Sequence, residues 1–129
     1  MKKLLPLSLL AVLGFSACVK EAGPEPDFAQ LDQDFQELVA LSGADDCTGD
    51  TQWRIAPVGS KPCGGPSSYL PYSTAIDTTQ FLQRVAEFTA EEKRLNEQYG
   101  QASDCSVEQA PTGVNCVDGS AELIYPAGS

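Results

Sequence analysis

Five cysteines in a chain of 129 residues constrain its fold more than any other feature. Cys18 stands apart at the end of an apolar amino-terminal stretch, which leaves an even set of four: Cys47, Cys63, Cys105 and Cys116. In an exported protein an even set predicts a disulfide framework, and four cysteines allow three pairings. We expect the sequential pairing, Cys47 with Cys63 and Cys105 with Cys116, because each bond then closes a short loop.

The amino-terminal segment has the three parts of an export signal. Two lysines at residues 2–3 are followed by an apolar run over residues 4–15 and by small residues before Cys18. The run is too short to span a membrane, which takes about 20 apolar residues. Ordinary secretory cleavage after Ala17 is the alternative, but it favours a small residue where the bulky Phe15 stands. The segment therefore predicts export with Cys18 at the cleavage site.

This pattern resembles the signal of bacterial lipoproteins, although Leu is commoner there in the place of Phe15. The resemblance implies that residues 1–17 are removed and that Cys18 receives a thioether-linked lipid and an acyl chain such as palmitate. Residues 18–26 contain two prolines and no apolar periodicity, which predicts a flexible tether. Val19 stands where some inner-membrane lipoproteins have aspartate. We therefore expect a lipid anchor in the bacterial cell envelope, in the outer membrane.

The chain is strongly acidic. Loss of the signal removes Lys2 and Lys3 and leaves six basic against 18 acidic residues, a formal side-chain charge of −12. Nucleic acid is not an expected partner, because phosphate recognition needs clustered Lys and Arg. A basic protein or a cation is better matched, although acidity in exported proteins more often serves solubility alone. Residues 27–129 suffice for a single folded domain with a modest core.

The sequence lacks the residues of the usual catalytic and metal sites. It has no histidine, and pairing of the four cysteines leaves no thiol as a nucleophile or zinc ligand. Asp45, Asp46 and Asp50 bring carboxylates close together in a turn, but without the alternating ligands and terminal Glu of a calcium loop. Ser, Lys or a pair of carboxylates such as Asp104 with Glu108 remain, but nothing in the sequence fixes a base beside a nucleophile or two acids across a cleft. We expect no enzyme activity, no cofactor and no metal.

Apolar periodicity predicts two helices. The first starts after Asp27, which can cap it, and ends near Gly43. The second covers residues 78–99, with Asp77 at its start and Gly100 at its end. Core packing is the expected role of the apolar face of both helices, and a partner-binding face is the alternative for the first. These faces comprise Phe28, Leu31, Phe35, Leu38 and Val39, and then Phe81, Leu82, Val85, Phe88, Leu95 and Tyr99.

Two strands are predicted at residues 53–58 and 69–73, and Pro57 and Pro71 favour edge positions for both. The Gly/Pro-rich loop between them, residues 59–66, has two interpretations. One is a structural turn in which Gly and Pro serve geometry and the nearby aromatic residues belong to the core, which we favour. The other is a preorganised recognition loop. Its candidate residues are Lys61 at the tip, Gly64 and Gly65, and an aromatic platform of Trp53, Tyr69 and Tyr72.

Asp118-Gly119 lies between two strand-like runs and predicts a terminal β-hairpin. We expect this hairpin to be joined through Cys116 to Cys105 and to pair with the strands at 53–58 and 69–73. The predicted fold class is α+β. A small, mostly antiparallel sheet packs against one long helix and one shorter amino-terminal helix, with two disulfides.

Several residues of the folded part together resemble a group of small, poorly characterised bacterial envelope lipoproteins and secreted proteins. They are Trp53, the run from Lys61 to Pro66, Tyr72-Ser73, Ser103-Asp104-Cys105 and Cys116. The resemblance covers about residues 47–125, and it implies a compact disulfide-stapled domain behind a lipid anchor and no known activity. We expect a noncatalytic envelope protein that presents an acidic binding domain. The alternatives are an inhibitor of a lytic enzyme or protease, and a structural or assembly component of an envelope complex.

Overall fold

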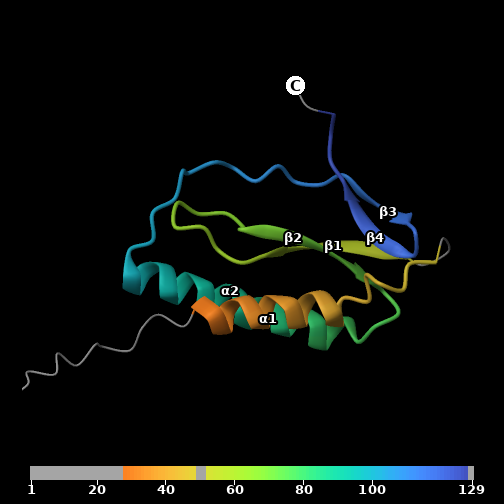
Figure 1. The fold of residues 1–129 in the computed structure, drawn as a ribbon, viewed down its shortest axis with the longest axis horizontal. Helices are drawn as coiled ribbons and strands as arrows, with labels where there is room; N and C mark the ends of the chain where they lie inside the picture. Colours follow the sequence, from red (N-terminus) through yellow and green to blue (C-terminus); the bar gives the residue numbers. More distant parts are fainter. Residues whose placement is uncertain (1–27, 49–51, 128–129) are drawn as a thin grey trace, which may run out of the picture.

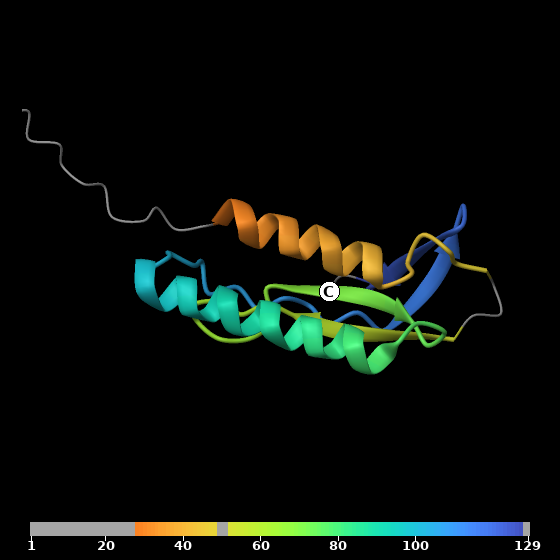
Figure 2. The ribbon, with the colours of Figure 1, turned by 90° about the horizontal axis from the view of Figure 1, so that it is seen from below.

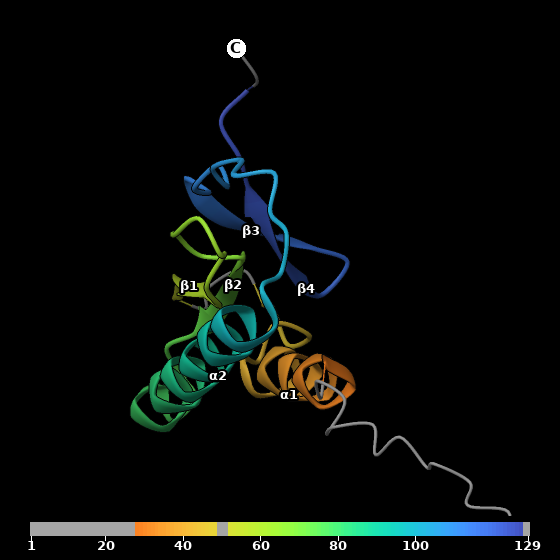
Figure 3. The same ribbon diagram turned by 90° about the vertical axis from the view of Figure 1, so that its left-hand side faces the viewer.

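The computed structural model describes residues 28–48 and 52–127. The predicted signal, the predicted lipidation site at Cys18, the predicted tether and the predicted helix cap at Asp27 lie outside the described residues. The elements follow one another as α1 (Phe28–Leu41), β1 (Trp53–Val58), β2 (Ser68–Ser73), α2 (Thr78–Tyr99), β3 (Gly113–Val117) and β4 (Ser120–Ile124). Both helices cover one side of the β1–β2 hairpin, and the β3–β4 hairpin lies on the other side (Figures 1 and 3).

The α+β fold class is confirmed, but the strands form two separate two-stranded antiparallel sheets, β1–β2 and β3–β4, in place of one. The chain that leaves α1 explains the separation. The Ala121 N–H donates to the Ala44 carbonyl (2.7 Å), and the Cys47 N–H donates to the Gly119 carbonyl (2.9 Å). The β3–β4 hairpin is therefore bonded to residues 44–47, and its backbone does not extend the β1–β2 sheet. In a two-stranded sheet every strand is an edge, as Pro57 and Pro71 predicted.

The predicted disulfide pairing is wrong. Cys47 is bonded to Cys116 and Cys63 to Cys105, at sequence separations of 69 and 42, so that the second bond lies inside the loop closed by the first. The prediction considered only loop length. The fold instead places Cys116 on β3 beside the segment that leaves α1, and it places residues 103–108 beside the Gly/Pro-rich loop. The expected link between the hairpin and Cys105 is thus replaced by a link to Cys47.

The core lies between the helices and one face of the β1–β2 hairpin. Ala56 pairs with Leu70 and Val58 with Ser68, so alternate residues of the two strands share a face. The apolar faces of both helices pack there, as predicted, with Leu82 as the exception at 43% exposed. The buried cluster comprises Leu31, Leu38, Ala56, Val58, Leu70, Tyr72, Phe81, Val85, Phe88 and Leu95, with Phe28, Phe35, Val39 and Tyr99 packed against it.

Local signals set the ends of α2 as predicted. The Asp77 side chain accepts a hydrogen bond from the Gln80 N–H, and Gly100 adopts a left-handed conformation with φ 59°. Gly43 follows α1 with φ 73°, and a side chain there would press on Ile76. A residue other than glycine is disfavoured at both positive-φ positions.

The predicted terminal hairpin is also confirmed. Asp118 and Gly119 both have positive φ, 49° and 87°, as a two-residue type I′ turn requires, and Val117 pairs with Ser120 across it. In contrast to the central strands, residues 101–127 include no buried side chain. No helix within the described ranges has the length and apolar character needed to cross a bilayer.

Candidate binding surfaces

Side chains of α2 hold the loop between β1 and β2. The Thr89 hydroxyl accepts from the Gly59 N–H (3.0 Å), and the Glu92 carboxylate accepts from the Ser60 N–H (2.6 Å). The Asn96 side-chain amide donates to the Ser60 carbonyl (2.6 Å). Thr89, Glu92 and Asn96 recur at the three- and four-residue spacing that places them on one side of a helix. The loop thus begins in a fixed position on α2.

Glycine is required where this loop begins. Gly59 has φ 78°, and a Cβ there would lie 1.9 Å from the Ser67 hydroxyl and 2.1 Å from a Glu92 carboxylate oxygen. The Ser67 hydroxyl itself donates to Glu92 (2.7 Å). The loop backbone therefore packs directly against polar side chains, with no room for a methyl group.

Lys61 lies in this loop but is not an exposed cationic tip. Its Nζ donates to the Ser106 carbonyl (2.9 Å) and hydroxyl (3.2 Å) and forms an ion pair with Glu108 (2.7 Å). Only 15% of the Lys61 side chain is exposed. The Cys63–Cys105 disulfide joins the same two segments. Lys61 therefore holds residues 103–108 against the loop and is not presented to a partner.

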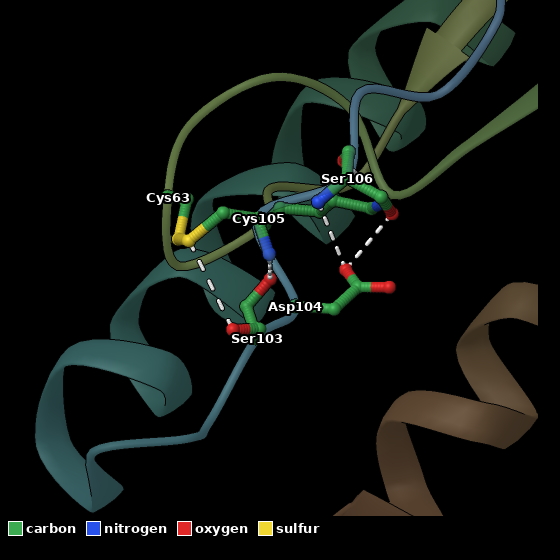
Figure 4. The surroundings of a disulfide bond; sticks show 6 residues. Cys63, Ser103, Asp104, Cys105 and Ser106 are labelled. Atoms are coloured by element: carbon green, nitrogen blue, oxygen red, sulfur yellow. Dashed lines mark hydrogen bonds between the residues drawn. A yellow bond between two sulfur atoms is a disulfide. The ribbon is translucent and has the colours of Figure 1, made fainter.

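Figure 4 shows how the chain turns beside this disulfide. The Asp104 carboxylate accepts from the N–H (3.0 Å) and hydroxyl (2.8 Å) of Ser106, and the Ser103 hydroxyl accepts from the Cys105 N–H (3.2 Å). The backbone and hydroxyl bonds from Ser106, aided by the charge of Lys61, lower the pKa of Asp104. Asp104 and Glu108, considered above as a pair of acids, thus bind different groups.

The proposed aromatic platform does not form. Trp53 pairs with Ser73 at one end of the β1–β2 hairpin, whereas Tyr69 pairs with Pro57, four residues further along β1, or about 13 Å. Alternation along β2 places Tyr72 on the opposite face, toward the helices. There Tyr72 is 6% exposed, and its ring centroid lies 5.0 Å from that of Phe81.

Gly64 and Gly65 form the turn of the loop. Their φ values are 96° and 85°, and a Cβ on either residue would meet no atom within 4 Å. The Gly64 N–H donates to the Lys61 carbonyl, and the Lys61 N–H donates to the Gly65 carbonyl, both at 2.9 Å. The two glycines are therefore needed for the backbone conformation of the turn, and not to make room for another group. This geometry favours the structural interpretation of the loop.

A different surface, which the sequence analysis did not identify, lies between α1 and α2. The two helices run side by side along the β1–β2 hairpin (Figure 2). Three hollows of about 200, 460 and 310 Å³ follow one another between them. The first two share Arg84, and the last two share Ala40, Leu41 and Gln80.

We call these three hollows together the interhelix groove. Its α1 wall and its α2 wall each consist of residues at three- and four-residue spacing, so each wall follows one side of a helix. On α1 they are Asp34, Glu37, Leu38, Ala40 and Leu41. On α2 they are Gln80, Phe81, Arg84, Glu87, Phe88 and Glu91, and Gly43, Ile76 and Asp77 close one end.

The rim of the interhelix groove is acidic. Among the described residues that line it, five carboxylates face one cation, Arg84. Arg84 reaches across from α2 to Glu37 on α1 (3.0 Å) and lies 3.9 Å from Glu87, and about half of each side chain is exposed. Arg94, beside the groove, donates to Glu91 and lowers the pKa of that carboxyl. The five carboxylates together with Arg84 and Arg94 carry a formal charge of −3.

The acidic turn after α1 was considered for calcium. Asp45 and Asp46 lie within the described residues, and Asp50 lies outside them. Over residues 28–48 and 52–127, no three His, Cys, Asp or Glu side chains come close enough together to hold a metal ion.

Local reasoning missed the interhelix groove because its walls, residues 34–41 and 80–91, lie far apart in the sequence. Two weak signals pointed to it. Leu41 is an apolar residue that lies off the core stripe and is 45% exposed, and Arg84 is the only basic residue in the first half of α2. Neither signal shows by itself that the two residues face each other.

Comparisons of this chain with protein-family models, with curated proteins and with solved structures find no match. Similarity therefore supplies no activity, ligand or partner for either surface.

Proposed function

We propose that this chain is a noncatalytic, lipid-anchored protein of the bacterial envelope whose acidic domain binds a basic protein through the interhelix groove. One observation carries the proposal: exposed Ala40 and Leu41 form an apolar floor between two helices whose facing sides hold four carboxylates, with a fifth, Asp77, at one end. A charged rim around an apolar centre is the usual anatomy of a protein interface. The excess of acid selects for a basic partner.

The amino-terminal sequence supports the anchor. Cys18 follows a short export signal, and the first described helix begins only ten residues later, at Phe28. A chain of that length reaches at most about 35 Å when fully extended. An anchor at Cys18 would therefore keep α1 and the groove close to the membrane surface, where they could meet proteins of the envelope.

The placement of the ionisable groups supports a noncatalytic role. The sequence has no histidine, and both pairs of cysteines are bonded. Glu92 accepts from the backbone of the β1–β2 loop, and Glu108 is paired with Lys61. Within the described residues these carboxylates serve structure. The two serine hydroxyls that reach a carboxylate, Ser67 on Glu92 and Ser106 on Asp104, belong to the same structural contacts around the loop.

Binding of a basic protein tests the proposal, and a lysozyme is a suitable first ligand because it is basic and lytic. Ala40→Lys puts bulk and positive charge into the groove, and it should weaken binding by about tenfold or more. Gln36→Lys is the matched control, because it makes the same charge change on an exposed side of α1 that does not line the groove. Its binding should stay within about twofold.

The same assay tests the recognition-loop interpretation. Pro62 is exposed in the loop, so Pro62→Glu alters that surface without removing the Lys61 ion pair. Loss of binding in Pro62→Glu, with Ala40→Lys unaffected, would move the site from the groove to the loop. If neither variant changes binding, the groove proposal fails.

Inhibition is a separate readout of the same complex, and charge complementarity favours a basic lytic enzyme over a protease. If the enzyme binds in the groove but cleaves its substrate at the normal rate, the protein is a binder and not an inhibitor.

An assembly role through the apolar face of α1 has less support. Phe28 packs on Tyr99 (6.3 Å between ring centroids) and Phe35 on Phe88 (5.7 Å), so these rings are used within the domain.

A further inference from the structure

We infer that the interhelix groove takes an amphipathic helix of about three turns from the basic partner, an inference that rests on the proposed function. The walls of the groove are two helices, and their facing residues extend from Asp34 to Leu41 on α1 and from Gln80 to Glu91 on α2. At 1.5 Å per residue these walls are about 10 and 17 Å long. A third helix laid along both walls would form a three-helix bundle with α1 and α2.

The floor of the groove suits the apolar side of such a helix. Leu41 is 45% exposed, and the hollow beside it and Ala40 has a volume of about 460 Å³. Hollows of about 200 and 310 Å³ flank it along the same line. A helix that binds in a groove inserts side chains spaced by three, four and seven residues, which produces a row of contacts of this kind.

The charges on the two walls suit basic residues on either side of that apolar row. Asp34 and Glu37 stand on α1, and Glu87 and Glu91 stand on α2. Arg84 lies across the groove between the first two hollows, held by Glu37 at 3.0 Å. Exposed ion pairs of this kind are weak. A Lys or Arg of the partner can therefore take the place of Arg84 at Glu37 while Arg84 swings toward solvent.

Other occupants fit the groove less well. A second copy of this chain would bring a second acidic surface against the first, and nucleic acid would be repelled by the same carboxylates. An extended peptide binds by adding to the edge of a sheet, whereas both walls of this groove are helices with satisfied backbone groups.

The test uses the full chain, exported by a bacterial host and purified from its envelope in a nonionic detergent. The probe is a fluorescent peptide of about 12 residues, with Leu at positions spaced by three, four and seven and Lys elsewhere, which covers three helical turns. A peptide of the same composition in scrambled order is its control. We expect the amphipathic peptide to bind at least about tenfold more tightly than the scrambled one and to gain helical circular dichroism on binding.

Variants locate the site. Ala40→Lys should weaken peptide binding about tenfold, and Gln36→Lys should change it by less than about twofold. Arg84→Gln removes the one cation among the described residues that line the groove, and it should tighten binding severalfold. Glu37→Gln with Glu87→Gln should weaken it, and both positions are exposed, so the fold is not at risk.

The outcomes separate this inference from the proposed function. Equal binding of the amphipathic and scrambled peptides would overturn the helix and leave charge-driven binding of a basic protein intact. The helix would also be overturned, and the proposed function kept, if neither peptide binds while lysozyme binding is still weakened by Ala40→Lys. If Ala40→Lys changes the binding of no ligand, both the helix and the proposed function are wrong.

Discussion

The two parts of the folded chain are held in different ways. The helices and the β1–β2 hairpin share one buried apolar cluster, whereas residues 101–127 contribute no buried side chain. This carboxyl-terminal part is joined to the rest by two disulfides, by Lys61 and by backbone bonds to residues 44–47. In this small domain, cross-links thus hold a part of the chain that buries no side chain of its own.

Loss of a core side chain should have the largest effect. Phe81 is 2% exposed in the centre of the cluster, so Phe81→Ala should lower the free energy of unfolding by about 3–5 kcal/mol. Chemical denaturation measures this change. Leu82→Ala is the control on the next residue, 43% exposed, and should cost less than about 1 kcal/mol. Equal losses for the two variants would contradict the described core.

Removal of the outer disulfide should cost almost as much but act on a different part of the molecule. The double variant Cys47→Ser with Cys116→Ser removes the bond between cysteines 69 residues apart. In the chain-entropy model its loss lowers the free energy of unfolding by about 4 kcal/mol. Hydrogen exchange should accelerate in β3 and β4 while α2 stays protected. Equal acceleration in α2 would show that the two parts unfold as one and would remove the distinction drawn above.

The two disulfides should differ in their reaction with a small thiol. Cys63 and Cys105 are both exposed, whereas Cys47 is only 5% exposed. Because the attacking thiolate must reach a sulfur atom, the Cys63–Cys105 bond should be reduced first. Alkylation of the released thiols followed by mass spectrometry gives the order. Reduction of Cys47–Cys116 first would indicate that the hairpin opens readily.

Loss of the Lys61 ammonium should have a smaller, local effect. Lys61→Met keeps most of the side-chain length but removes three polar contacts, and we expect a loss of about 1–2 kcal/mol. Faster amide exchange in residues 103–108 is the specific readout. Lys93→Met is the matched control, because Lys93 is 65% exposed and its ion pair with Glu97 should be worth less than about 0.5 kcal/mol.

Protonation of Asp104 should give the smallest effect. Hydrogen bonds from Ser106 stabilise the charged carboxylate, so its pKa in the folded protein is below the ordinary value. The stabilisation is therefore complete above the ordinary pKa and is lost as the pH falls through the lowered one. An NMR titration of the Asp104 carboxyl measures this, and Ser106→Ala should raise the pKa. An unchanged pKa in that variant would mean that the N–H of residue 106, which the substitution keeps, lowers the pKa without help from the hydroxyl.

Features encoded by neighbouring residues could be predicted from the sequence. Asp77 and Gly100 mark the ends of α2 through a side-chain cap and a left-handed residue, and both signals act within one helical turn. Asp118-Gly119 encodes its turn in the same local way. These elements needed no knowledge of what packs against them, and each one is confirmed.

Features that depend on distant residues could not be predicted. The pairing of Cys47 with Cys116 follows from where the hairpin docks, and loop length alone favoured another choice. Lys61 has the sequence context of an exposed tip, but its partners lie 45 and 47 residues further along the chain. The interhelix groove likewise joins residues such as Glu37 and Arg84 that have no local relation.

The nested disulfides have a consequence for the survival of the chain after proteolysis. Residues 101–112 have no regular secondary structure, and Val107 within them is 93% exposed, as suits a site of cleavage. A cut after Cys105 falls inside the loop closed by Cys47 and Cys116, and a cut before it falls inside both loops. The nicked molecule therefore stays in one covalent piece, with the helices still joined to the hairpin, until a reductant separates them.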